Sequence, residues 1–325
     1  MTRPAVLVIW NLALTILLLL PLEIGVRYFY RVPYRRTSPG LHPSAKQAVW
    51  VDPDDDLGWT VTRSAEFSAL EQIPYQINRQ GFRDVRDFTS KEEGGSTRAV
   101  VLGDSFTFGA HLPEAEVFPR ILNQFLGARW DVVNMGVPGY GIDQMVLAYE
   151  KYRDVLKPKV VLLVFIAEDM ERVFEAFRRS EGLLKPSFDL FQGKLRPRVP
   201  AGGSVFDPLL DSSRVANFIY FNGYRPWQYR RISRAFVRRL ADSVAADHAQ
   251  LIVAQYPMLD QERKQLTHVT GVFERDLIDM GATYIDLIKV FDGKGDPARF
   301  FLADGHPNGM ANDLVARALL SGWPR

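Results

Sequence analysis

The stretch AVVLGDSFTFG, residues 99–109, decides the fold that we expect for this chain. Its first four residues are apolar and Gly103 ends the run, which is typical of a short buried strand leading into a tight turn. Ser105 lies on that turn, at the carboxyl edge of the predicted sheet. Open α/β sheets bind ligands at this edge, so we expect the serine to face a cleft.

Four later apolar runs repeat the pattern, and helical segments alternate with them. The uninterrupted apolar run at residues 159–166 suits a strand that is buried on both faces. Alternating strands and helices predict an α/β fold, in which helices cover both faces of a parallel sheet. The predicted strands cover residues 131–134, 159–166, 250–256 and 282–287, and the predicted helices cover residues 116–125, 142–152, 227–246, 260–280 and 308–320.

A membrane anchor is expected at the N-terminus. Residues 4–22 carry no charge and match the length of a bilayer core, so we expect them to contact the lipid bilayer as a single-pass helix. No small-residue cleavage site follows, which favours an anchor that is retained. Arg3 precedes the run, and the segment after it mixes arginines with aromatic residues that suit the headgroup region: Arg27, Tyr28, Phe29, Tyr30, Arg31, Tyr34, Arg35 and Arg36.

The rest of the chain divides into two parts. After an anchor and basic flank at residues 1–36, residues 37–97 are rich in Pro, Asp, Ser and Gly and predict a stalk and irregular lead-in with a few short strands. Residues 98–325 form the α/β domain. An insertion at about residues 171–224 follows the third strand, where it is either a lid or substrate platform or a variable surface loop.

Composition excludes several classes of function. The 40 Lys and Arg residues nearly balance the 38 Asp and Glu residues, which argues against a nucleic-acid partner. The absence of cysteine removes thiol nucleophiles, disulfides, zinc fingers and iron–sulfur clusters. We expect no cofactor and no metal, because the carboxylates are scattered and no two histidines have helix-face spacing. The basic helix at residues 225–240 has either a solvated face or a surface for anionic lipid or polysaccharide.

A serine hydroxyl needs a base to become a nucleophile, and the chain has five histidines. His306 is the preferred base, because Asp304 lies two residues away and is able to orient its imidazole while the other ring nitrogen faces Ser105. His111 is the rival base. We discount it because it lies only six residues after Ser105 and no nearby carboxylate is evident.

Three motifs resemble conserved blocks of the SGNH/GDSL hydrolases. GDSFTFG at residues 103–109, NMGVPGYG at 134–141 and DGHPN at 304–308 are similar to the first, second and last blocks of that family. INRQGFRD at residues 77–84 resembles the lead-in of membrane-anchored bacterial members. The resemblance covers most of the chain apart from residues 171–224. It implies the three-layer, flavodoxin-like sandwich of the family.

The resemblance also implies residue roles. Ser105 would be the nucleophile, His306 the general base and Asp304 its orienter. The backbone N–H groups of Ser105 and Gly136 would stabilise the oxyanion, because negative charge builds on the carbonyl oxygen during acyl transfer.

One position departs from the family pattern. The family places Asn-Asp after the third strand, and the asparagine side chain supplies another oxyanion donor, whereas this chain has Glu168 before Asp169. An ionised glutamate donates no hydrogen bond and repels the oxyanion. Glu168 is therefore either protonated, or turned away while another group fills the role, or a sign of impaired activity.

Three functions follow from this reading. The first is a membrane-anchored serine esterase that acts on acetyl-like esters, with an envelope glycan as the expected substrate class. The second is a catalytically impaired binding or assembly factor in polysaccharide modification or export, and the third is an O-acetyltransferase with the same triad. The arginines after the anchor favour a cytoplasmic body, whereas the resemblance implies a catalytic domain outside the cytoplasmic membrane.

Overall fold

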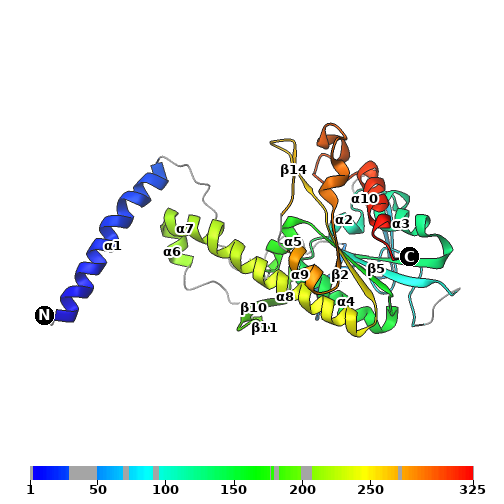
Figure 1. Cartoon of the computed structure of the whole chain (residues 1–325), viewed down its shortest axis with the longest axis horizontal. Coiled ribbons are helices and arrows are strands. Elements are labelled where there is room, and N and C mark those ends of the chain that lie inside the picture. The colour runs from blue at the N-terminus through cyan, green and yellow to red at the C-terminus, as the bar shows by residue number, and fades with distance from the viewer. Residues whose placement is uncertain are drawn as a thin grey trace. The chain divides into compact units, whose positions relative to one another are not determined.

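The structure is a computed structural model of the chain. It describes residues 3–28, 50–68, 73–90, 95–175, 177–178, 183–198, 207–269 and 273–324. These residues fall into two compact units (Figure 1). One unit comprises Met1–Ser44 and Val199–Gln228, and the other comprises Ala45–Arg198 and Tyr229–Arg325.

The second unit is built on a five-stranded parallel sheet of order β15-β12-β7-β5-β6. This confirms the predicted sheet, with strand ends shifted by only a few residues. Because β6 and β7 lie on opposite sides of β5, the order of the strands reverses at β5. A crevice for ligands forms at such a reversal, beyond the carboxyl ends of the strands. The strands are β5 (Thr97–Gly103), β6 (Trp130–Gly136), β7 (Val160–Phe165), β12 (Gln250–Gln255) and β15 (Thr283–Asp286).

Helices cover both faces of this sheet, as predicted (Figure 1). Neighbouring strand residues such as Val100 and Val101 belong to opposite cores, because side chains alternate across a strand. One face packs against α4 (Ile142–Leu156) and the part of α8 (Arg225–Ala246) that belongs to this unit, and the other face packs against α3 (Phe118–Leu126) and α10 (Gly309–Ser321).

The lead-in differs from the predicted stalk. Residues 50–68 and 73–88 join the hydrophobic core of the α/β unit, where Trp59 is fully buried and Tyr75 and Phe82 are nearly so. The Tyr140 hydroxyl donates to the Trp59 carbonyl at 2.6 Å, which ties the lead-in to the loop after β6. Widely spaced single aromatic residues give no periodic signal, so composition suggested a stalk. The lead-in contains two hairpins, formed by β1 (Val51–Asp54) with β2 (Gly58–Val61) and by β3 (Ala65–Ser68) with β4 (Pro74–Ile77).

The helix predicted over residues 260–280 is largely wrong. The segment begins with a hairpin of β13 (Met258–Asp260) and β14 (Gln265–Thr267), and only α9 (Glu274–Asp279) is helical. The Asp260 side chain accepts hydrogen bonds from the amides of Glu262 and Arg263 at 3.1 and 3.0 Å. An aspartate that binds the backbone in this way favours a turn over a helix.

The predicted insertion is divided between the two units. Its first part forms short hairpins in the α/β unit, held by an ion pair between the buried side chains of Lys185 and Asp143. The strands are β8 (Phe177–Arg178), β9 (Leu183–Leu184), β10 (Ser187–Phe191) and β11 (Lys194–Arg198). The remaining short helices of this unit are α2 (Ser105–Phe108), α5 (Ala167–Arg172), η1 (Glu114–Glu116), η2 (Gly127–Arg129), η4 (Leu287–Phe291) and η5 (Pro297–Phe300).

The first unit contains α1 (Arg3–Tyr28), α6 (Asp207–Ser212), α7 (Arg214–Ile219) and the π-helix η3 (Tyr220–Tyr224). The N-terminal segment is thus helical, as predicted. None of the helices in the described residues is both long and apolar enough to cross a membrane, so the structure does not support the span expected over residues 4–22. The predicted aromatic and basic positions Phe29, Tyr30, Arg31, Tyr34, Arg35 and Arg36 lie outside the described residues.

Glu23 connects α1 to α7. Its carboxylate accepts hydrogen bonds from the Ser213 hydroxyl at 2.9 Å and from the amides of Arg214 and Val215 at 2.6 and 3.0 Å. Partial burial raises the pKa of Glu23, but these hydrogen bonds outweigh it and lower the pKa to about 2. A negative charge at the first turn of α7 also suits the positive end of the helix dipole.

Candidate active site

Ser105 lies where the sequence predicts it, on the turn between β5 and α2. Gly103 is required there, because a Cβ atom would lie 2.0 Å from the Thr107 hydroxyl and 2.8 Å from the Val164 carbonyl. Asp104 caps α2 by accepting a hydrogen bond from the Phe106 amide at 2.9 Å. The tight packing and the cap hold the serine at the carboxyl edge of the sheet.

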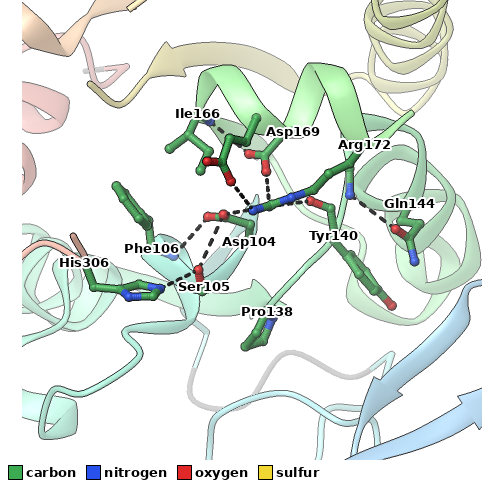
Figure 2. A network of polar contacts seen from close by, with 12 residues as sticks. Asp104, Ser105, Phe106, Pro138, Tyr140, Gln144, Ile166, Asp169, Arg172 and His306 are labelled. Atoms are coloured by element: carbon green, nitrogen blue, oxygen red, sulfur yellow. Dashed lines mark hydrogen bonds and ion pairs between the residues drawn. The ribbon is translucent and has the colours of Figure 1, made fainter. Parts of the chain in front are cut away.

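The structure brings the three predicted triad residues together. His306 Nε2 lies 2.9 Å from Ser105 Oγ (Figure 2). His306 Nδ1 lies 2.8 Å from Asp304 Oδ2. The other Asp304 oxygen accepts a hydrogen bond from the His306 amide at 3.0 Å. Burial raises the pKa of Asp304, but the hydrogen bonds from His306 outweigh it, so the pKa lies below its usual value. Asp304 is therefore a carboxylate placed to hold one tautomer of the imidazole.

His111 also belongs to this site, contrary to the prediction. Its Nε2 atom lies 3.1 Å from Asp304 Oδ2, the same oxygen that contacts His306. The backbone of His111 has a φ of 65°, and its amide donates to the Tyr75 hydroxyl at 2.8 Å. A carboxylate partner is thus present. The prediction missed it because Asp304 is distant in the sequence and only the fold brings it to this loop.

The two histidines and Asp304 are also the residues here that could hold a metal ion. One ligand atom from each lies within 4.8 Å of the others. Histidine spacing along single helices does not reveal this group, because His111 comes from the loop after α2 whereas Asp304 and His306 lie together in the loop before α10. Imidazole and carboxylate ligands of this kind suit divalent transition metals.

Arg172 organises the opposite side of Ser105. Its Nη1 atom donates to Asp104 at 3.0 Å, to Asp169 at 2.5 Å and to the Tyr140 carbonyl at 3.1 Å (Figure 2). Its Nη2 atom donates to Glu168 Oε2 at 3.0 Å. Burial, and then the neighbouring Asp104 carboxylate, raise the pKa of Asp169 well above its usual value, although Arg172 opposes this. The guanidinium fixes Asp104, and Asp104 fixes the turn that carries the serine.

Glu168 faces the site. Its side chain is 56% exposed, lines the cavity beside Ser105 and forms an ion pair with Arg172. The alternative in which this side chain turns away is therefore wrong. A carboxylate in an ion pair with a guanidinium accepts hydrogen bonds and does not serve as an oxyanion donor.

Gly136 does not lie where an oxyanion donor is needed. Its amide donates to the Asn134 side chain at 2.9 Å, and it is absent from the described residues that line the cavity. A Cβ atom at Gly136 would lie 2.3 Å from the Phe108 amide nitrogen, so this glycine allows β6 to pack closely against α2. Gly139, three residues later, lines the cavity together with Ser105 and has a φ of 83°.

The site opens into a cavity of about 940 Å³. Most of its wall is apolar, and much of it comes from the lead-in and from the β13–β14 hairpin, neither of which the sequence predicted in this form. Trp50, Phe67 and Tyr75 come from the lead-in, and Met258, Leu259 and Gln261 come from the hairpin. Phe106 and Phe108 come from α2, and Ile166 follows β7 at the sheet edge.

Comparison with known proteins gives fold-level similarities only. No family model matches the chain, and no curated protein matches it. Similar solved structures include an α/β hydrolase enzyme from the metagenome of Lake Arreo, Spain (TM-score 0.45, 17% identity, 69% of this chain and 94% of that chain). Others are a mutant of an acetyl-xylooligosaccharide esterase from Geobacillus (0.44, 15%, 72% and 98%) and a member of the lipolytic protein G-D-S-L family from Veillonella parvula (0.41, 13%, 71% and 100%). At these identities and TM-scores, they add no argument about activity.

Proposed function

We propose that this chain is a serine-dependent carboxyl-ester hydrolase. One observation carries the proposal: Ser105, His306 and Asp304 form a continuous relay, with contacts of 2.9 and 2.8 Å, in the wall of a large cavity. A hydroxyl, an imidazole and a carboxylate in this order are the parts that acyl transfer through a serine requires.

The relay supports a two-step reaction. His306 Nε2 accepts the proton of Ser105 Oγ as this oxygen attacks the ester carbonyl, and Asp304 stabilises the imidazolium that results. The tetrahedral intermediate collapses, and His306 returns the proton to the departing alcohol. Water then attacks the acyl-serine with the same imidazole as base, which releases the acid and restores the serine hydroxyl.

The oxyanion requires donors that are not already engaged. The amides of Ser105 and Gly139 fit, since both residues line the cavity and neither amide has an acceptor among the described residues. They replace the predicted pair of Ser105 and Gly136. One donor of this type contributes about 10²–10³ in rate.

A fluorophosphonate serine probe tests this function. Wild type is expected to be labelled in a time-dependent way, whereas Ser105→Ala is expected to stay unlabelled. Ser187→Ala serves as a matched control, because Ser187 is a buried serine outside the cavity. An unlabelled wild-type protein, together with no hydrolysis of any simple ester, would rule the proposal out.

A binding or assembly factor is the second candidate. The Glu168 carboxylate beside Ser105 favours it, because a negative charge there opposes the developing oxyanion. The two candidates differ in turnover: a binding factor would be labelled by the probe slowly or not at all and would release no acid from esters.

The substrate class and the location are finer proposals. The proposal that the substrates are acetyl-like esters of an envelope glycan rests on the family resemblance alone. Contact of α1 with lipid is supported by the uncharged run at residues 4–22 and by exposed leucines such as Leu17 and Leu18. A catalytic unit outside the cytoplasmic membrane rests on the family resemblance. Alkaline phosphatase is active only outside that membrane, so a phosphatase fused after Arg325 is expected to be active. A fluorescent protein fused at the same position is expected to stay dark. The reverse result would remove envelope glycans as substrates.

A further inference from the structure

The polar wall next to Ser105 carries an excess of negative charge. Three carboxylates, those of Asp104, Glu168 and Asp169, surround the single guanidinium of Arg172 at 3.0, 3.0 and 2.5 Å. Even with Asp169 counted as neutral, two negative charges face one positive charge. Asp104 and Asp169 are buried, so water does not screen them well.

Glu168 presents this excess charge to the cavity. Its Oε2 atom binds Arg172, whereas Oε1 has no hydrogen-bond partner among the described residues. The carboxylate of Asp304 also lines the cavity and is 44% exposed, and its partners are the imidazoles of His111 and His306 and the His306 amide. Two carboxylates therefore border the space in which the ester must lie.

No free cation balances them. Of the described residues that line the cavity, Arg172 is the only lysine or arginine, and its side chain is 9% exposed and engaged by four acceptors. A substrate anion would find no partner in this wall and would be repelled by Glu168. A substrate cation would find a carboxylate oxygen without a hydrogen bond, in a cavity whose lining also includes aromatic rings that attract cations.

We propose that the site selects esters that carry an alkylammonium group near the scissile bond, and that Glu168 is the residue that confers this selectivity. The inference rests on the proposed ester hydrolase function and adds the substrate class. It also accounts for a carboxylate at a position where it opposes the oxyanion: the substrate cation offsets that charge in the complex.

A pair of esters of equal shape isolates the effect of charge. Butyrylcholine has a quaternary nitrogen at the position where 3,3-dimethylbutyl butyrate has a quaternary carbon. Wild type is expected to hydrolyse the choline ester with a kcat/KM about tenfold higher at low salt, and the ratio is expected to fall as salt screens the carboxylate. A ratio at or below one would overturn the proposal.

Two variants assign the effect to one carboxylate. Glu168→Gln is expected to bring the ratio close to one. Glu171→Gln makes the same change of charge on the same helix but outside the cavity lining, and is expected to keep the wild-type ratio. Equal ratios in wild type and Glu168→Gln would show that Glu168 is not the selecting residue.

Binding separates this inference from the hydrolase function. Ser105→Ala has no nucleophile, so calorimetry of this variant with each ester measures charge preference without turnover. Tighter binding of butyrylcholine, by about tenfold, that disappears in Ser105→Ala/Glu168→Gln supports the inference even if no ester is hydrolysed. Equal binding of both esters would overturn it, whether or not wild type is an esterase.

Discussion

At the scale of single residues, Asp304 contacts two histidines. One of its oxygens contacts both His306 and His111, at 2.8 and 3.1 Å, and the remaining oxygen holds the His306 amide. His306 alone of the two histidines reaches Ser105 through its second ring nitrogen. We therefore propose His306 as the base, and His111 shares its carboxylate partner.

Replacement of each histidine tests this division. His306→Ala is expected to lower kcat for a simple ester by about 10³-fold or more, because the proton acceptor is lost. His111→Ala is expected to lower it by only about tenfold, since Asp304 keeps its contacts with His306. Steady-state kinetics on 4-nitrophenyl esters measures both. Comparable losses in the two variants would contradict the assignment of the base.

At the scale of secondary-structure elements, close backbone packing positions the serine. The end of β6 lies so near α2 that a methyl group at Gly136 would stand 2.3 Å from the Phe108 amide nitrogen. Because α2 begins with Ser105, any shift of this helix moves the nucleophile.

Gly136→Ala is expected to destabilise the protein by about 3 kcal/mol and to reduce ester turnover at the same time. Gly127→Ala is the control: its φ of 68° is strained for alanine, but no atom lies within 4 Å of the new Cβ. A loss of about 1–3 kcal/mol with unchanged turnover is expected there, because a φ of 68° with a ψ of −170° is a backbone conformation that is essentially restricted to glycine. Urea unfolding and kcat provide the two measurements, and equal behaviour of both variants would argue against the packing role.

The contact between α1 and α7 depends on pH. Glu23 has a pKa of about 2 in the folded chain against an ordinary value of 4.5, so its contribution to stability is fully present above pH 4.5 and is lost as the pH falls toward 2. Hydrogen exchange at the amides of Arg214 and Val215, relative to their intrinsic rates, is expected to lose protection over this range. Glu23→Gln is expected to abolish the pH dependence; a dependence that persists in this variant would point to another group.

At the scale of the whole molecule, the α/β unit includes its lead-in. The hairpins of residues 51–77 bury Trp59 within the same core as α4 and α8, and they supply part of the cavity wall. The lead-in and the sheet should therefore unfold together.

Trp59→Ala tests whether the lead-in and the sheet unfold together. Loss of a fully buried indole is expected to cost about 3–5 kcal/mol. Near-ultraviolet and far-ultraviolet circular dichroism are expected to report one shared transition at lower denaturant concentration. Separate transitions, or an unchanged midpoint, would show that the lead-in folds independently of the sheet.

Local pattern alone determined the five strands, the turn that carries Ser105 and the pairing of Asp304 with His306. Each of these depends on residues within a few positions of one another, where periodicity, a glycine or a short spacing leaves a readable signal. The hairpin of residues 258–267 was not predicted, because the hydrogen bond that the Asp260 side chain accepts in the turn overrides a weak helical pattern.

Only the tertiary structure decided which distant groups share the site. Three features depend on how separate segments pack: the contact of His111 with Asp304, the contact of Arg172 with Asp104, and the lead-in wall of the cavity. Such contacts join residues that are remote in the chain. They leave no local sequence pattern, so they cannot be predicted from a single sequence. They follow from burial of the two faces of the sheet, which brings the loops at its carboxyl edge together.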